Sequence, residues 1–252
     1  MPIIAMARGT FSGAKEVAQA VAETLSYRLV SREDIIEKTA QYGMTKERQD
    51  RARQRKLSLL QRKQLDWIHY RAYARAALTK EIRQGSLVYL GSNGRVLLRD
   101  FPNVLNVMVV ADMEYRIDNL IRRTEHVINR KKARRFIEEI DERKDRWQRH
   151  FYGDDWQRYS EFDLIIHPGQ VSIPDACENI LTALEQPSYQ TTHKSLETID
   201  LLTVAAELRA RIAMKADVAD DNVQVDVRDG MVVVTGSVRS PEDMEGIREL
   251  LD

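Results

Sequence analysis

Residues 2–16 have the sequence PIIAMARGTFSGAKE, and they decide how the rest of the chain is interpreted. The apolar run Pro2–Met6 is too short for a helix and is typical of a buried strand. A glycine-containing loop, Gly9–Gly13, follows it, and from Lys15 onward apolar residues recur at helical spacing. The stretch therefore predicts a strand, a loop and a helix, an arrangement in which N–H groups at the helix N-terminus can bind phosphate.

The loop matches only part of the phosphate-binding pattern G-x-x-x-x-G-K-[ST]. Gly9 and Lys15 match, whereas Ala14 stands in place of the second glycine and Glu16 in place of the Mg²⁺-binding hydroxyl. The alternative is a tight strand-to-helix turn in which Glu16 stabilises the helix N-terminus. The pattern alone leaves both interpretations open.

Further apolar runs alternate with helical patterns along the chain. Continuous runs rich in β-branched residues are typical of strands buried on both faces of a parallel sheet. Such strands are predicted at residues 27–30, 87–90, 105–110 and 162–166, and helices at 15–25, from Ser31 onward, within the Arg-rich region 112–149 and at 173–184. This alternation predicts an α/β fold with a doubly wound parallel sheet.

Residues 46–84 are highly charged, with apolar residues near one helical face, and predict a long helix or a helix pair inserted into the α/β domain. Residues 46–83 carry 12 Lys or Arg and 4 Asp or Glu. Nucleic-acid binding through this segment is the least favoured alternative function, and a steep salt dependence would be its signature.

The C-terminal residues follow a different pattern. The polar stretch Gln186–Ser195 predicts a linker, and a helix is expected over residues 198–214. Alternating valines then lead into Asp229-Gly230, a strong β-hairpin signal, and a last helix is expected from Pro241 to Leu251. These elements predict a small α+β domain.

Composition restricts the class of protein. The 252 residues are 43% hydrophobic and 31% charged, which suits a globular protein with a sizeable core. No apolar stretch approaches the roughly 20 residues of a membrane span, and the single cysteine, Cys177, fits a reducing cytoplasm. Residues 1–190 carry 32 basic and 26 acidic residues, and residues 191–252 carry 7 and 13. The basic part favours phosphate-bearing ligands.

Several stretches, in order along residues 1–185, carry a resemblance to the cytidylate kinase-like family. They are RGTFSGAKE at 8–16, VYLG at 88–91, DMEYR at 112–116, DERKDRW at 141–147 and FDLII at 162–166. The resemblance implies a P-loop nucleoside monophosphate kinase fold with an Arg-rich lid, in which ATP and Mg²⁺ deliver a γ-phosphoryl group to a nucleotide such as CMP.

The resemblance also implies site residues. Those expected to bind the cofactor are Gly9, Thr10, Phe11, Ser12, Gly13, Ala14, Lys15 and Glu16. Those expected to be catalytic are Lys15, Arg116, Arg143 and Arg146. No metal ligand is assigned, although Glu16 is a candidate unconventional Mg²⁺ contact. For any single arginine, a solvated helix surface remains the alternative.

Two other features bear on the ligands. Family kinases usually place an acceptor-binding arginine after Gly91, whereas this chain has Ser92, with Arg95 nearby. The aromatic residues of 147–159 either stack on a base or pack the lid against the body.

The residues from about Thr198 resemble a BON-type domain, which implies a phospholipid- or protein-binding module. The expected domains are thus residues 1–187, kinase-like, and 197–252, an incomplete BON-like domain. The acidic charge of the second argues against direct attachment to an anionic membrane.

The resulting hypothesis is a cytoplasmic, nucleotide-binding phosphotransferase of the nucleoside monophosphate kinase type. The alternative is a catalytically silent nucleotide sensor or scaffold whose C-terminal domain binds a partner. Nucleic acid is not an expected partner, and the sequence leaves the acceptor and the oligomeric state open.

Overall fold

A computed structural model describes residues 2–43, 60–124, 128–152, 159–215, 222–238 and 240–251. The chain divides into two compact units, each described by itself. The first consists of Met1–Ser31, Ser86–Val96 and Asn103–Gln190, and the second of Arg32–Gly85, Leu97–Pro102 and Thr191–Asp252. None of the helices formed by the described residues is long and apolar enough to cross a membrane.

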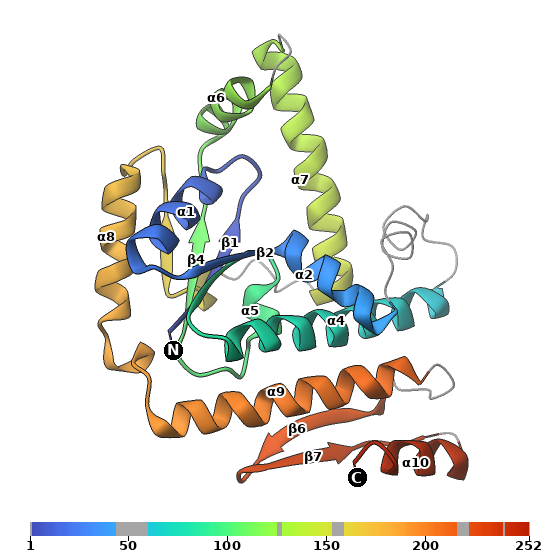
Figure 1. The fold of residues 1–252 in the computed structure, drawn as a ribbon. Helices are drawn as coiled ribbons and strands as arrows, with labels where there is room; N and C mark the ends of the chain where they lie inside the picture. The colour runs from blue at the N-terminus through green and yellow to red at the C-terminus, as the bar shows by residue number, and fades with distance from the viewer. Residues whose placement is uncertain are drawn as a thin grey trace. The chain divides into compact units, whose positions relative to one another are not determined.

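The first unit contains a five-stranded parallel sheet (Figure 1). Its strands are β1 (Ile3–Arg8), β2 (Arg28–Ser31), β3 (Leu87–Leu90), β4 (Val104–Val109) and β5 (Leu164–Ile166). Their order is β2-β3-β1-β4-β5, with β1 paired to β3 and β4. The doubly wound parallel sheet expected from the apolar runs is therefore confirmed.

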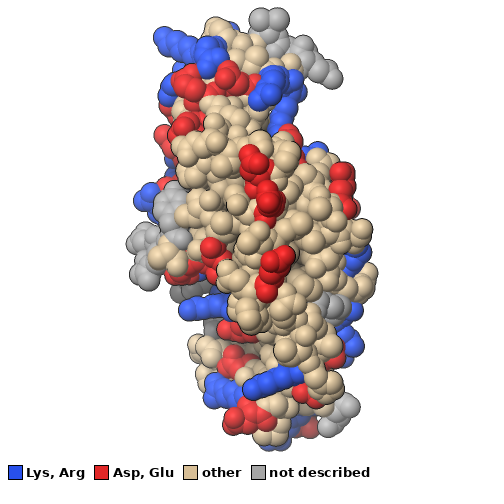
Figure 2. Space-filling view, turned by 90° about the vertical axis from the view of Figure 1, so that its left-hand side faces the viewer, with Lys and Arg blue, Asp and Glu red and all other residues tan. Residues whose placement is uncertain are grey.

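Helices α1 (Ala14–Leu25) and α8 (Ile173–Leu184) pack against each other and cover one face of the sheet. Ile4 and Met6 of β1, with alternate residues of β3 and β4, form the core beneath them, and Cys177 is one of its small members. Ser172 caps α8 by accepting a hydrogen bond from the Asp175 N–H. In the view of Figure 2, acidic side chains and no basic ones lie along α8, whose sequence contains no Lys or Arg.

The Arg-rich region forms two helices, α6 (Met113–Arg123) and α7 (Arg130–Tyr152), rather than one continuous element. Ile117 and Leu120 of α6 pack on Ala133 and Ile137 of α7 in a separate small core. Short helices complete the unit: α5 (Gly94–Leu97), which ends at its border, η3 (Tyr159–Glu161) and η4 (Pro187–Tyr189).

The second unit contains the predicted helical insertion. It comprises α2 (Arg32–Lys38), η1 (Thr39–Tyr42) and the long α4 (Leu60–Arg83). Helix α4 packs along α9 (His193–Met214), and Ala72 and Ala76, expected on its apolar face, are buried. Helix α9 begins five residues before the expected position because Thr192 and Ser195 form a capping box.

A two-stranded antiparallel sheet, β6 (Gln224–Arg228) and β7 (Met231–Thr235), follows α9. Asp229 and Gly230 at its turn have φ of 50° and 74°, the positive values that a type I′ turn requires. The last helix, α10 (Pro241–Arg248), contributes Ile247 to a small core with Leu208 and Ile212 of α9. The predicted hairpin is confirmed.

Candidate functional site: a phosphate loop and an adjoining cationic pocket

The loop between β1 and α1 has the form of an anion cradle. Its start is fixed by the Gly9 N–H, which donates to Val109 O at 2.9 Å, and the Ser12 N–H donates back to Gly9 O at 3.3 Å. Within the described residues, the N–H groups of Ala14, Lys15 and Glu16 have no acceptor. These N–H groups at the positive end of the α1 dipole can bind a phosphate.

Gly13 is the residue of this loop that must be glycine. Its φ is 85°, in the left-handed region, and a Cβ there would lie 3.0 Å from the Tyr115 hydroxyl. Ala14 is buried, is the first residue of α1 and has no positive φ. The departure at Ala14 is therefore compatible with the cradle, because the left-handed turn lies one residue earlier.

Lys15 and Glu16 lie in the first turn of α1. The Lys15 side chain is exposed, and it makes no ion pair with the described residues. One carboxylate oxygen of Glu16 pairs with Arg123 of α6. Its other oxygen is buried without a hydrogen-bond partner in the described part of the chain, as is the Ser12 hydroxyl. Hard oxygen atoms of this kind suit Mg²⁺, so the residues present fit a metal bound beside phosphates.

A pocket of about 410 Å³ adjoins the start of the loop at the carboxyl ends of β1 and β4. Gly9 and Thr10 line it, together with residues of α5, α6 and α7. Five cationic side chains face it: Arg8, Arg95, Arg116, Lys144 and Arg149. Three carboxylates also line it: Asp141, Glu142 and Asp145. The pocket is thus predominantly cationic and open to a phosphate-bearing molecule.

Arg116 and Lys144 join the pocket to the loop. The Arg116 Nε donates to Thr10 O at 2.7 Å, and its terminal nitrogen pairs with Asp141 of α7. The Lys144 Nζ donates to the Thr10 hydroxyl at 2.9 Å. Two cations from different helices therefore meet at one residue of the loop.

The two other arginines expected from the sequence lie elsewhere. Arg143 and Arg146 are exposed on α7 and do not line the pocket, and Arg146 pairs with Glu142 at 3.5 Å. Lys144 and Arg149, which sequence reasoning missed, line it instead. The sequence did contain a signal for Lys144 and Arg149. Residues 144–145 and 148–149 follow Asp141 at spacings of three to four, so all of them share one face of the helix.

Two family models match separate parts of the chain. Residues 3–170 match the model of the cytidylate kinase-like family. The chain belongs to the cytidylate kinase-like family. Residues 200–251 match the BON domain model. No protein with a curated description matches the chain.

Solved structures with similar folds include an uncharacterized protein from Eubacterium ventriosum ATCC 27560. It has a TM-score of 0.53 and 22% identity, and the match covers 74% of this chain and 99% of that one. A shikimate kinase from Bacteroides thetaiotaomicron has a TM-score of 0.43 and 12% identity over 73% of this chain and 99% of that one. A sugar kinase from Janibacter sp. HTCC2649 has a TM-score of 0.44 and 14% identity over 77% and 99%.

One departure from the family pattern lies in the pocket. Ser92 stands where the resemblance leads us to expect an arginine, directly after Gly91, and both Ser92 and Arg95 line the pocket. The Arg95 guanidinium lies 5.9 Å from the Phe162 ring centroid and pairs with Glu161. These contacts hold a cation at the pocket although position 92 carries none.

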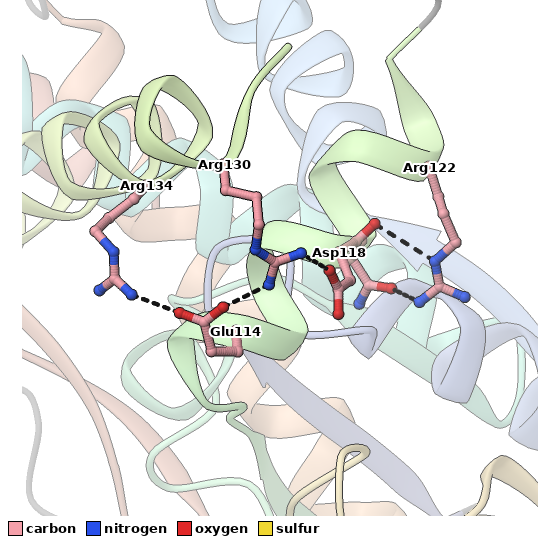
Figure 3. Close-up of polar contacts among 6 residues, drawn as sticks. Glu114, Asp118, Arg122, Arg130 and Arg134 are labelled. Carbon is pink, nitrogen blue, oxygen red and sulfur yellow. Dashed lines mark hydrogen bonds and ion pairs between the residues drawn. The ribbon is translucent and has the colours of Figure 1, made fainter. Parts of the chain in front are cut away.

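Exposed ion pairs join α6 and α7, the Arg-rich region that the resemblance leads us to expect as a lid (Figure 3). Glu114 faces both Arg130 and Arg134, and Asp118 pairs with Arg130 at 2.6 Å. The hydrogen bond from Arg130 lowers the pKa of the Glu114 carboxyl. Since all of these groups are exposed, they orient the two helices and contribute little to stability.

Two sequence interpretations fall largely outside the described residues. The aromatic segment 147–159 includes Trp156, which is not described, and the side chains of Trp147 and Tyr159 are not described either. The basic segment 46–83 is described from residue 60, and its side chains from residue 68.

Proposed function

We propose that the chain is an ATP-dependent phosphotransferase that delivers the γ-phosphoryl group to a nucleoside monophosphate-like acceptor. The observation that carries the proposal is the junction of an anion-binding loop with a cationic pocket at Gly9 and Thr10. Membership of a kinase-like family supports the same reaction class. Because ATP is abundant in the cytoplasm, a cytoplasmic location is part of the proposal.

The N–H groups of Ala14 to Glu16 and the exposed Lys15 amine would bind the ATP phosphates. Glu16 and Ser12 would hold Mg²⁺ through their unpartnered oxygens, and the metal would supply neutralisation of phosphate charge. Arg116 and Lys144 would stabilise the charge of the transferring group, which is the main task of the protein in phosphoryl transfer.

The acceptor would occupy the pocket. Arg95 and Arg149 lie at its lining and would bind the acceptor phosphate, and the buried Gln148 amide can both donate to and accept from a base. Lys144 and Arg149 thereby take the role that the sequence assigned to Arg143 and Arg146, because only the former pair lines the pocket.

Calorimetric binding of ATP to the full chain, with and without Mg²⁺, tests the proposal first. We expect micromolar affinity that Lys15→Ala weakens by about tenfold or more, since one charge-assisted hydrogen bond contributes about 1.5–3 kcal/mol. Lys131→Ala, an exposed lysine on α7, is the matched control and should bind as the wild type does. Absence of binding at millimolar ATP would reject the kinase mechanism.

A catalytically silent nucleotide sensor or scaffold is the second candidate. Three of the cationic side chains of the pocket already pair with carboxylates, which favours this candidate because these charges are then partly neutralised. The pairs are Arg95 with Glu161, Arg116 with Asp141 and Arg149 with Asp145. In that case the BON domain would carry the function by binding a protein or lipid partner. Lys15-dependent ATP binding with no transfer to CMP, dCMP or UMP would support this candidate over the enzyme.

A further inference from the structure

One face of α6 is directed at the phosphate loop. Arg116, Asn119 and Arg123 are spaced i, i+3 and i+7, so they share a helical face. Arg116 donates to Thr10 O, Asn119 donates to Phe11 O, and Arg123 pairs with Glu16. Three side chains of one helix thus contact both the tip of the loop and the first turn of α1. We call these three residues the α6 clamp.

Asn119 is the member of the α6 clamp with the most defined geometry. It is buried, and its Nδ2 donates to Phe11 O at 3.0 Å. Its Oδ1 accepts a hydrogen bond from Arg122, which fixes the orientation of the amide. Removing the Nδ2 donor would deprive the partly buried Phe11 carbonyl of its hydrogen bond to Asn119.

Phe11 shows why the loop needs such support. Its φ of 57° lies in the left-handed region, which is unfavourable for a residue with a side chain. Its ring packs on the core shared by α6 and α7, with its centroid 6.4 Å from that of Phe136. A strained residue persists when surrounding contacts determine its conformation, and here those contacts come from α6 and α7.

We propose that α6 sets the conformation of the phosphate loop, with Asn119 and Phe11 as positioning residues that touch no substrate. The loop presents its free N–H groups only while α6 and α7 are packed on it. Binding of nucleotide phosphates at the loop and packing of the lid are therefore thermodynamically coupled and stabilise each other. The nature of the ligand rests on the proposed function, whereas the control of the loop by α6 does not.

Hydrogen exchange of the full chain without nucleotide tests the control of the loop. The reporters are the amides of Ser12 and Val17, which donate to Gly9 O and Gly13 O. Asn119→Asp keeps the size and the acceptor but removes the donor, and we expect these amides to exchange about tenfold faster. Glu139→Gln, which removes an exposed ion pair with Arg135 within α7, is the control and should leave them unchanged. Wild-type exchange in Asn119→Asp would overturn the proposal.

Phe11→Gly provides a second variant because glycine retains access to positive φ, while the substitution removes the side chain that packs on α6 and α7. We expect it to accelerate the same amides as Asn119→Asp does. If the two amides exchange at the wild-type rate in Phe11→Gly, the Phe11 ring does not help to set the loop conformation and the proposal fails for Phe11.

ADP with Mg²⁺ is the probe for the coupling. In the wild type, ADP should slow the exchange of the α6 amides. In Asn119→Asp, the affinity for ADP should fall about tenfold and ADP should no longer slow that exchange. ADP that binds both proteins equally would overturn the coupling. If ADP binds neither, the proposed function fails, while the exchange result without nucleotide still decides whether α6 controls the loop.

Discussion

At the scale of single residues, the conformation of the phosphate loop depends on which residue has the left-handed backbone conformation. The sequence pattern places its second glycine at position 14, where this chain has alanine. The turn itself lies at Gly13, so the alanine starts a helix, for which it is the best residue. A mismatch to the pattern is therefore compatible with the geometry.

Gly13→Ala should destabilise the protein by about 1 kcal/mol or more, because alanine is strained at positive φ. It should also meet the Tyr115 hydroxyl at 3.0 Å. Urea unfolding measures the change, and Gly43→Ala is the control, since Gly43 has φ of 77° with no atom within 4 Å of a new Cβ. Tyr115→Phe, added to Gly13→Ala, removes the hydroxyl that the new Cβ meets. If it recovers none of the excess destabilisation of Gly13→Ala over Gly43→Ala, the close contact has no energetic effect.

Adjacent residues on α7 separate the pocket from the helix surface. Lys144 lines the pocket and donates to Thr10, whereas Arg143 is exposed outside it. We expect Lys144→Ala to lower kcat/KM for phosphoryl transfer by about tenfold or more, and Arg143→Ala to change it less than about twofold. Steady-state kinetics with ATP and CMP measure both, and equal effects would contradict the assignment of the pocket.

At the scale of elements, a partly buried polar cluster joins η1, α4 and α9 within the second unit. The Tyr42 hydroxyl donates to Glu207 Oε2 at 2.6 Å, and Lys80 Nζ lies 2.9 Å from the same oxygen. The Tyr42 ring stacks on Tyr73, with centroids 5.4 Å apart. Burial, and then the hydrogen bond to Glu207, raises the pKa of Tyr42 to about 12.

This pKa predicts a loss of stability at high pH. Between its unfolded pKa, about 10, and its folded pKa, the unfolded state releases the Tyr42 proton and the native state keeps it. The contribution is therefore fully present below pH 10 and is lost as the pH rises toward 12. Urea unfolding from pH 8 to 11 should show a steeper decline for the wild type than for Tyr42→Phe. Parallel curves for the two proteins would disprove the linkage.

At the scale of the whole molecule, the C-terminal residues are not a free appendage. Helix α9, which includes the start of the BON match, packs along α4, which comes from the insertion between β2 and β3. Ala72, Ala76 and Leu78 of α4 and Ile199 and Leu202 of α9 are buried. The second unit is therefore assembled from segments far apart in the sequence.

Truncation after Gln190 should accordingly impair more than the BON domain. Removal of α9 uncovers the apolar face of α4, at a cost of about 25 cal/mol for each Å² exposed. We expect residues 1–190 to unfold at a lower temperature and to lose helix signal beyond that of the deleted residues. Circular dichroism and thermal unfolding of the fragment and the full chain test this. A fragment with the Tm of the full chain would show that α4 is stable without α9.

The sequence by itself determined what local rules control. Continuous apolar runs predicted the strands of the parallel sheet, Asp229-Gly230 the hairpin turn, and the pattern of residues 173–184 the helix α8, because each depends on residues close in the chain. The family resemblance pointed to the phosphate loop and Arg116, and Gly9, Thr10 and Arg116 line the pocket.

The tertiary structure alone decided what depends on packing between distant segments. Lys144, Arg149, Arg143 and Arg146 are all basic residues on α7. The rotation of α7 about its axis decides that Lys144 and Arg149 line the pocket and the other two do not. Only the packing of α4 on α9 joined the insertion to the C-terminal residues. Only the approach of α6 brought Asn119 to Phe11, 108 residues away in the chain, where no local rule acts.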